Sequence, residues 1–338
     1  MAKLLTNQAI YYEAGVTPGT FAPLANSGDN KTFTDTRKPW SLATGSEAVI
    51  APMGLLTGGA VTPAAALGNN NVDVAALTAM MPAATGASAN TGILTVAATI
   101  NIAVTRSATG GTPYLTTSIT ITGAGAAAAV AGTAGAAQSE TRGAAGGPPL
   151  IPVDSIEISQ VRLSSITAAP VTASEIFQAP GLHQERADYP VYTADYLGGK
   201  ITFASALPLV HVGSLPKRVY ARVSTPIFAE IPNTKDWVPA KESISVSSEA
   251  YYDGVVGSSS SSIGSASFSV AFGIDGVTDA LLGKEGQNLM FMFKPDKNGV
   301  SYQLTQGTFA IAQTFGVKAA PAGAVTIAAQ QATRNFAS

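Results

Sequence analysis

Residues 242–274, "ESISVSSEAYYDGVVGSSSSSIGSASFSVAFGI", alternate small polar with apolar side chains at both ends of the stretch. Alternation with a period of two predicts strands whose two faces differ in polarity. We therefore expect residues 242–252 and 266–274 to pair as antiparallel strands, with a long flexible loop between them. The apolar face of the second strand is formed by Ala266, Phe268, Val270, Phe272 and Ile274.

The other face of this predicted pair carries small hydroxyl groups and one acid. Such a smooth, weakly acidic face suits an aqueous channel through which a polyanion slides, because phosphates find few cations to bind there. The alternative interpretation is an ordinary solvated face of an antiparallel sheet. The candidate channel-lining residues are Ser243, Ser245, Ser247, Glu249, Ser265, Ser267 and Ser269.

The serine run between the strands does not have the pattern of a catalytic loop. A nucleophile elbow needs Gly-x-Ser-x-Gly, whereas Gly257 is followed by five serines and Ile263. A free interdomain linker is also disfavoured, because alternating segments flank the run closely on both sides. We expect a hairpin loop that contacts a neighbouring subunit through Gly257, Ser258, Ser260, Ser262 and Gly264.

The remaining C-terminal residues predict an antiparallel sheet with one short helix. Residues 276–283, "GVTDALLG", allow about two helical turns. Residues 288–306 form a predicted hairpin with Asn298–Gly299 in its turn, and 308–318 and 324–330 supply further strands. The fold class expected is mainly β, an antiparallel sandwich or partial barrel with a packed helix.

The first half of the chain is less regular in pattern. We expect an N-terminal arm and loops over 1–60, an Ala/Gly-rich inserted or outer β region over 61–148, and the main β domain over 149–338. Within the insertion, residues 69–82 predict a helix ended by Pro82. Residues 93–105 and 113–123 predict a hairpin, and 123–149 a flexible connection.

Composition narrows the possible functions. Charged residues make up 12% of the chain and the net charge is −2, which argues against a protein that grips nucleic acid. A surface so poor in charge favours self-association. Cysteine is absent, which excludes disulfides and thiolate catalysis. Neither a signal-peptide run nor a transmembrane run is found, so we expect neither export nor membrane insertion.

Catalytic and metal-binding motifs are weak. Ser214 and Lys217 match Ser-x-x-Lys formally but lie beside a proline before a strand. His183, Glu185 and Asp188 could ligate a metal, although a solvated polar loop explains them better, and His211 lies in an apolar strand. No dinucleotide fingerprint or phosphate loop is present. We expect no enzymatic activity, no cofactor and no metal.

The order of elements in the last hundred residues resembles that of the tail tube (major tail) proteins of long, non-contractile-tailed bacteriophages. The resemblance is carried by "ESISVSSEAYYDG", "ASFSVAFGI", "TDALLG", "LMFMFKPDKNGVSYQL" and "GTFAIAQTFGVKAAPAGAVTIAAQ". It implies stacked hexameric rings whose subunits complete one continuous β-barrel, with the short helix outside. Residues 61–148 depart from the family's minimal fold.

The resemblance also implies partners and a location. The lumen would hold the tape-measure protein and conduct DNA during ejection without specific binding. Tail terminator and distal tail proteins would be further partners, and the virion tail would assemble in the host cytoplasm. The alternatives are a capsid decoration protein or an adhesin; a porin is a third, but its strands should be longer than those expected here.

Overall fold

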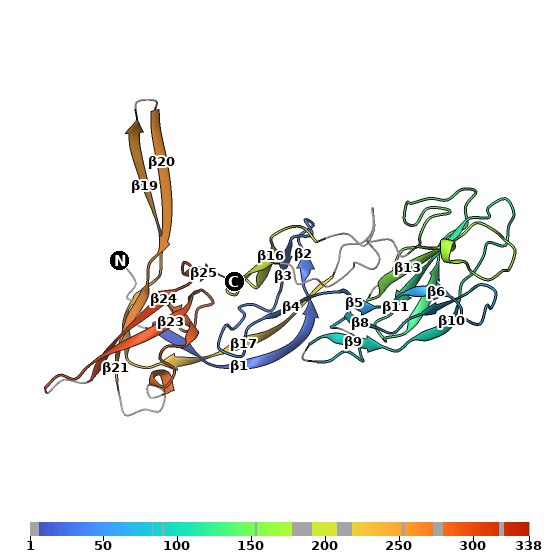
Figure 1. Cartoon of the computed structure of the whole chain (residues 1–338). Helices are drawn as coiled ribbons and strands as arrows, with labels where there is room; N and C mark the ends of the chain where they lie inside the picture. Colours follow the sequence, from blue (N-terminus) through green and yellow to red (C-terminus); the bar gives the residue numbers. More distant parts are fainter. Residues whose placement is uncertain are drawn as a thin grey trace.

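The computed structural model describes residues 7–82, 84–89, 91–152, 154–177, 191–207, 218–251, 254–272, 280–317 and 321–337. The protein is mainly β, and its sheets are antiparallel, which confirms the predicted fold class. Figure 1 shows three units in a row: a C-terminal body, a small middle unit and an outer domain. Each unit has a hydrophobic core of its own.

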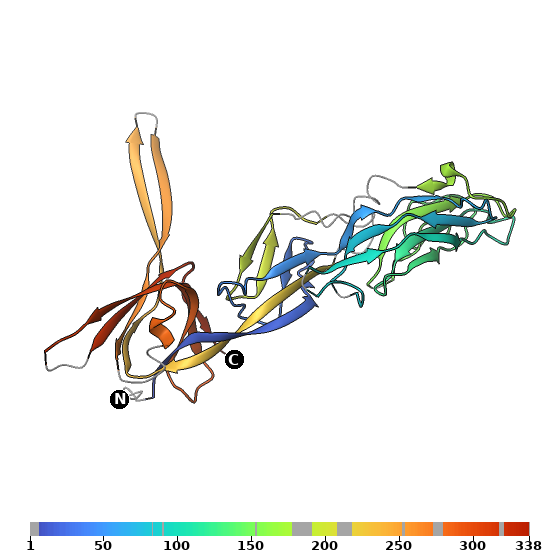
Figure 2. The same cartoon turned by 60° about the horizontal axis from the view of Figure 1, so that its bottom comes forward.

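The C-terminal body is built on a nine-stranded sheet. The strand order is β18-β21-β24-β23-β22-β1-β17-β4, and β25 pairs with β23. Residues 280–282 are helical, and this short helix lies beside the sheet (Figure 2). Leu281 is buried in the core of the body. The strands are β1 (Ala9–Pro23), β4 (Val49–Pro52), β17 (Val219–Ile231), β18 (Thr234–Val238), β21 (Ala266–Ala271), β22 (Asn288–Lys294), β23 (Tyr302–Thr314), β24 (Ala322–Ala329) and β25 (Arg334–Phe336).

The C-terminal predictions are largely confirmed. The hairpin β22–β23 and the strands β23 and β24 form where they were expected. Residues 298 and 299 lie in the connection between β22 and β23. Helix is found at 280–282, while residues 276–279 lie outside the described part of the chain.

Strand β1 contradicts the prediction of an irregular N-terminal arm. It pairs with β17 from Ile10 to Pro23 and with β22 over its first residues, so it is a central strand. Gly15, Pro18 and Gly19 are residue types common in turns, but here they fall at or beside register shifts within the pairing. A Cβ at Gly19 would lie 2.5 Å from the carbonyl oxygen of Val223, so glycine permits this close approach.

The middle unit joins the C-terminal body to the outer domain. Its sheet has the order β15-β16-β3-β2, and Trp40, Phe33 and Phe203 are buried in its core. Gly198 and Gly199 lie in the connection between β15 and β16, and Gly199 has a φ of 60°. The strands are β2 (Ala25–Asn26), β3 (Thr32–Thr34), β15 (Tyr192–Asp195) and β16 (Lys200–Phe203).

The outer domain consists of small sheets around one core. Their orders are β12-β11-β13-β14, β10-β7-β6 and β5-β8-β9. The core draws residues from Met53 to Val171 and also includes Tyr220 of β17, so it extends beyond the predicted region 61–148. Its elements are β5 (Gly54–Gly58), β6 (Val61–Pro63), β7 (Asn71–Val74), β8 (Leu77–Met80), β9 (Ile93–Val96), β10 (Thr99–Ala103), β11 (Leu115–Ile121), β12 (Ala127–Ala131), β13 (Ile156–Leu163), the 3-10 turn η1 (Ala173–Glu175) and β14 (Ile176–Phe177).

Three predictions inside this domain are wrong. Residues 69–82 form β7 and β8 instead of a helix, because Val72 and Val74 alternate into the core. β10 pairs with β7 and not with β11, which lies between β12 and β13. The segment 123–149 contains β12 and is tied down by backbone hydrogen bonds such as that from Gly146 N to Thr133 O, 2.7 Å.

Candidate assembly surface

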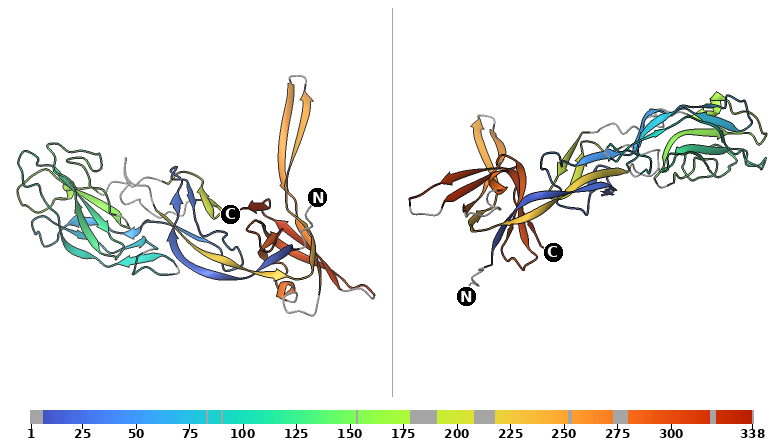
Figure 3. Two further views of the ribbon diagram at one scale, coloured as in Figure 1. Left: turned by 180° about the vertical axis from the view of Figure 1, so that it is seen from behind. Right: turned by 90° about the horizontal axis from the view of Figure 1, so that it is seen from below.

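The stretch 242–263 forms a long two-stranded hairpin that projects from the C-terminal body (Figures 1 and 3). Strand β19 (Glu242–Tyr251) pairs with β20 (Gly254–Ile263) along its whole length. The predicted pairing of residues 242–252 with 266–274 is therefore wrong, and the predicted serine loop is a strand. We call β19 and β20 the serine hairpin.

A local sequence signal favours the pairing of β19 with β20. Asp253-Gly254 is a dipeptide typical of hairpin turns, and Gly254 is the first residue of β20, paired with Tyr251. Val255, Val256 and Ile263 give the following segment enough β-branched residues for a strand. β20 is thus closer to β19 in sequence than β21 is. Pairing β19 with β20 therefore requires the closure of a shorter loop.

The faces of the serine hairpin differ in chemistry. Ser243, Ser245 and Ser247 lie opposite Ser262, Ser260 and Ser258, respectively, so they share one face. The hydroxyl oxygens of Ser243 and Ser262 are 2.9 Å apart, and those of Ser247 and Ser258 are 2.7 Å apart. The other face presents Ile244 and Val246, with 69% and 76% of their surface exposed. The hairpin therefore offers both an apolar strip and a hydroxyl strip.

No further strand pairs with either edge of this hairpin in the described residues. An isolated two-stranded hairpin is at best marginally stable in water, because it has no packed face. Free edges and exposed β-branched side chains are also a template for pairing with another chain. The serine hairpin has the properties of an element completed by a partner.

The body sheet has a separate face of small residues, formed by β21, β24 and β23. In β21, Ala266, Phe268 and Val270 point into the core, as predicted, and the intervening serines point outward. Ser267 pairs with Thr326, and Ser269 pairs with Ala324. This small-residue face comprises Ser267, Ser269, Thr308, Ala310, Ala312, Ala324, Thr326 and Ala328.

The predicted channel-lining residues are thus divided between two surfaces. Ser267 and Ser269 lie on the small-residue face, and Ser265 is exposed just before β21. The other members lie on β19, with Glu249 opposite Val256. All of these residues were expected on one face because β19 was expected to pair with β21. The residues missed by sequence analysis are those of β23 and β24, whose alternation of small exposed and apolar buried positions was a usable signal.

A second apolar projection lies at the far end of β23. Phe315 and Val317 follow this strand with 73% and 94% of their surface exposed. In Figure 1 the ends of β23 and β24 extend beyond the rest of the body. Large apolar residues exposed at a protruding tip are typical of contact sites.

Buried Glu13 lies at a bulge of β1, where the body meets the segment that follows β3. Its carboxylate accepts a hydrogen bond from Ser41 Oγ and another, of 3.1 Å, from Met290 N. Burial raises the pKa of this carboxyl above its ordinary value, and the hydrogen bonds and the nearby Lys284 only partly oppose the effect. Both carboxylate oxygens have structural partners, which indicates a structural role.

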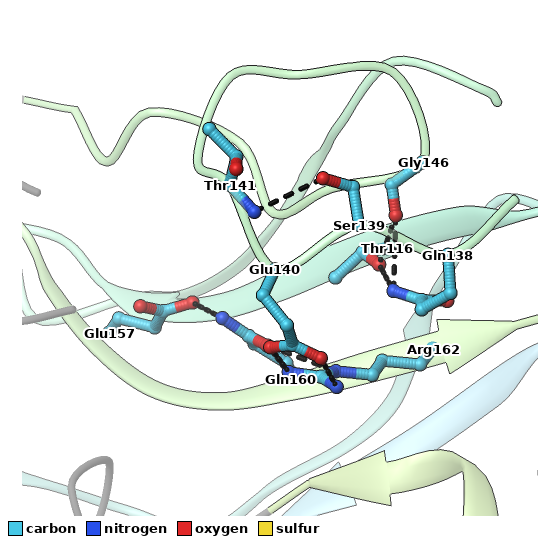
Figure 4. Close-up of polar contacts among 9 residues, drawn as sticks. All are labelled: Thr116, Gln138, Ser139, Glu140, Thr141, Gly146, Glu157, Gln160 and Arg162. Atoms are coloured by element: carbon cyan, nitrogen blue, oxygen red, sulfur yellow. Dashed lines mark hydrogen bonds and ion pairs between the residues drawn. The ribbon is translucent and has the colours of Figure 1, made fainter. Parts of the chain in front are cut away.

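The outer domain contains a buried ion pair. Arg142 NH2 lies 2.5 Å from Glu157 Oε2, and both side chains are almost fully buried. Glu157 Oε1 also accepts hydrogen bonds from Ser118 Oγ at 2.5 Å and Gln160 Nε2 at 3.2 Å. Nearby, Gln138 Nε2 donates to the carbonyl of Gly146 at 3.0 Å (Figure 4).

Toward the surface of the same cluster, Arg162 forms a two-armed ion pair with Glu140 at 2.6 and 2.8 Å (Figure 4). The Arg162 guanidinium also lies 4.0 Å from the centre of the Phe177 ring. Since each carboxylate of the cluster faces a guanidinium, the arrangement fixes the loop 132–149 to β13.

No group of three or more potential metal ligands lies together among the described residues. His183, Glu185, Asp188, His211, Ser214 and Lys217 all lie outside that part of the chain. None of the helical residues described forms a helix long and apolar enough to cross a membrane.

Comparison with protein-family models and with curated proteins finds no match to this chain.

Proposed function

We propose that this chain is a structural subunit that polymerises as stacked hexameric rings into the tail tube of a long, non-contractile bacteriophage tail. The lumen holds the tape-measure protein and conducts DNA during ejection. The chain acts without a cofactor and without enzymatic activity. The observation that carries the proposal is the serine hairpin, a projecting pair of strands with both edges free in the described chain.

The strands at the two edges of the body sheet also support the proposed assembly. Within the described part of one chain, the sheet ends at β18 on one side and at β4 on the other. Open edges of this kind invite pairing, and joining copies into a closed barrel removes them. A ring of subunits would therefore satisfy backbone groups that one chain leaves at its sheet edges.

The small-residue face is the better candidate for the lumen wall than the group expected from sequence. Its exposed side chains are Ser, Thr and Ala, and its only flanking cation in the described strands is Lys235, beside Ser269. Lys235 itself lies 3.7 Å from Asp236. A wall with so few cations gives a sliding polyanion little to bind. The serine hairpin is then assigned to contacts between copies.

Electron microscopy of the purified protein tests the proposal. We expect tubes or stacked rings from the full chain, and none from a variant in which Ser243–Ser262 is replaced by a short Asn-Gly turn. Since the described side chains in the deleted range are exposed and none of them belongs to the body core, the variant should keep the melting temperature of the body. Tubes formed by the shortened variant, or compact particles without a channel from the full chain, would contradict the proposal.

A further inference from the structure

Strand β17 contributes side chains to the cores of all three units. Its last residue, Ile231, lies in the core of the C-terminal body. Tyr220 lies in the core of the outer domain, with 2% of its surface exposed. Because successive residues of a strand point to opposite faces, the residues on either side of Tyr220 face the middle unit instead. The members of β17 in the middle core are Val219, Ala221 and Val223.

Neighbouring strands support β17 on both sides where it meets the outer domain. Tyr220 is paired with Pro23 of β1 on one side and with Ala51 of β4 on the other. Figures 2 and 3 show β1 and β17 as one twisted ribbon that runs from the C-terminal body toward the outer domain. Paired backbone with buried side chains opens rarely, so this ribbon is stiffer than an unpaired linker.

The chain enters the outer domain through a very short connection. Strand β4 ends at Pro52 and β5 begins at Gly54, so Met53 alone joins them. The backbone nitrogen of Met53 donates a hydrogen bond of 2.9 Å to the carbonyl oxygen of Arg218, next to the start of β17. Domains that move freely are joined by exposed, flexible linkers, and this junction lacks the length for one.

Asp154 of the outer domain binds the start of β17 through polar contacts. Its Oδ1 lies 2.5 Å from Arg218 NH1 and accepts a hydrogen bond of 3.0 Å from the hydroxyl of Tyr220. Farther along the strand, Arg222 NH1 donates to the carbonyl oxygen of Ala89 in the outer domain at 3.1 Å. These directional contacts accompany the burial of the Tyr220 ring and restrict rotation of the outer domain about β17.

We propose that β17 is a rigid strut that fixes the orientation of the outer domain, with the side chain of Tyr220 holding the strut in the outer core. Since β17 is also a member of the body sheet, a displacement of the outer domain is transmitted to that sheet and is not absorbed at a flexible joint. The orientation is fixed within one chain, independently of polymerisation.

The absence of cysteine allows a direct distance measurement with spin labels. Thr95→Cys on β9 and Thr225→Cys on β17 place the two labels at exposed positions, one in the outer domain and one on the strut. Pulsed electron double resonance on dilute protein then gives the distribution of distances between them. We expect a narrow distribution with the native Tyr220 and one at least about twofold wider with Tyr220→Ala. A broad distribution with the native residue, or equal widths in the two proteins, would overturn the proposal.

Leu163→Ala separates loss of orientation from loss of stability. Leu163 is fully buried in the same core as Tyr220 but lies on β13. Its truncation should lower the melting temperature of the outer domain, because it leaves a cavity, and should keep the distance distribution narrow. If L163A widens the distribution as much as Y220A does, the widening reflects a weakened core, and the strut is refuted.

A second variant tests the polar contacts without removing the ring. Arg218→Met with Tyr220→Phe deletes both partners of Asp154 and keeps an aromatic side chain in the outer core. Arg218 and Asp154 are 41% and 47% exposed, so this variant should fold. We expect a distribution wider than that of the wild type and narrower than that of Y220A. A width equal to that of the wild type would overturn the proposal.

Discussion

The outer domain and the serine hairpin differ in how much of their side-chain surface is buried within one chain. The outer domain buries an apolar core and an Arg142–Glu157 ion pair within one chain. In the serine hairpin the described side chains of β19 and β20 are exposed, including Ile244 and Val246. The same composition, low in charge and rich in small residues, thus makes one element that is complete and one that requires a partner.

The largest effect on stability is expected from Arg142→Met. The substitution leaves Glu157 buried without its counter-ion, which typically costs about 3–5 kcal/mol. Urea unfolding followed by a probe in the outer domain measures the loss. The matched control is Glu140→Gln, which breaks an ion pair whose acid is 75% exposed and should cost less than about 1 kcal/mol. Equal costs for the two variants would show that the outer domain does not depend on its buried pair.

Ile244→Ser with Val246→Ser should act on assembly and leave folding unchanged. Because both side chains are exposed, their loss is expected to change the free energy of unfolding by less than about 0.5 kcal/mol. Polymerisation, measured by sedimentation, should require at least about tenfold more protein, since burial of each side chain in a partner contributes about 1.5 kcal/mol or more. Ser245→Thr on the opposite face serves as the control. A lower melting temperature with normal polymerisation would show that these side chains stabilise the fold of one chain and do not take part in assembly.

Glu13→Gln should remove a pH dependence of stability in the body. The pKa of Glu13 is raised in the folded state, so its contribution is fully present below the unfolded pKa near 4.5 and is lost as the pH rises through the folded pKa. The wild type should therefore lose stability relative to E13Q over this interval, by about 1.4 kcal/mol for each unit of pKa shift. Thermal unfolding at pH 4 and pH 7 checks this. A constant difference between the two proteins across the interval would exclude the effect.

The smallest effect on structure is expected from Ser269→Lys. The side chain lies on the small-residue face opposite Lys235, so a lysine can extend into solvent at a cost of about 1 kcal/mol or less from the like charge. Tubes should form normally, whereas retention of single-stranded DNA should increase and should fall with added salt. Ser245→Lys, on the serine hairpin, should not produce this retention. Equal DNA retention by both variants would argue against the small-residue face as a lumen wall.

Alternation in β21, β23 and β24 was enough to predict these strands and the core positions of Phe268 and Val270. The partner strand of β19 was harder to predict. Its sequence is compatible with pairing to β20 or to β21, and the serine run was interpreted as a loop. The helix expected at 69–82 failed because a short run with Val72 and Val74 fits both periods. β1 was missed because its glycines and proline occupy bulges, which sequence does not distinguish from turns. The ion pair between Asp195 and Arg334 joins units distant in the chain, so no local pattern could indicate it.

Hydrogen exchange in β19 and β20 tests most directly whether the serine hairpin is completed by a second copy. The measurement compares dilute, unpolymerised protein with sedimented polymer by mass spectrometry of the peptides covering Glu242–Tyr251 and Gly254–Ile263. We expect rapid exchange in the dilute protein and strong protection in the polymer, while the peptides of β11 and β13 are protected in both. Equal exchange of the hairpin in the two states would contradict the account.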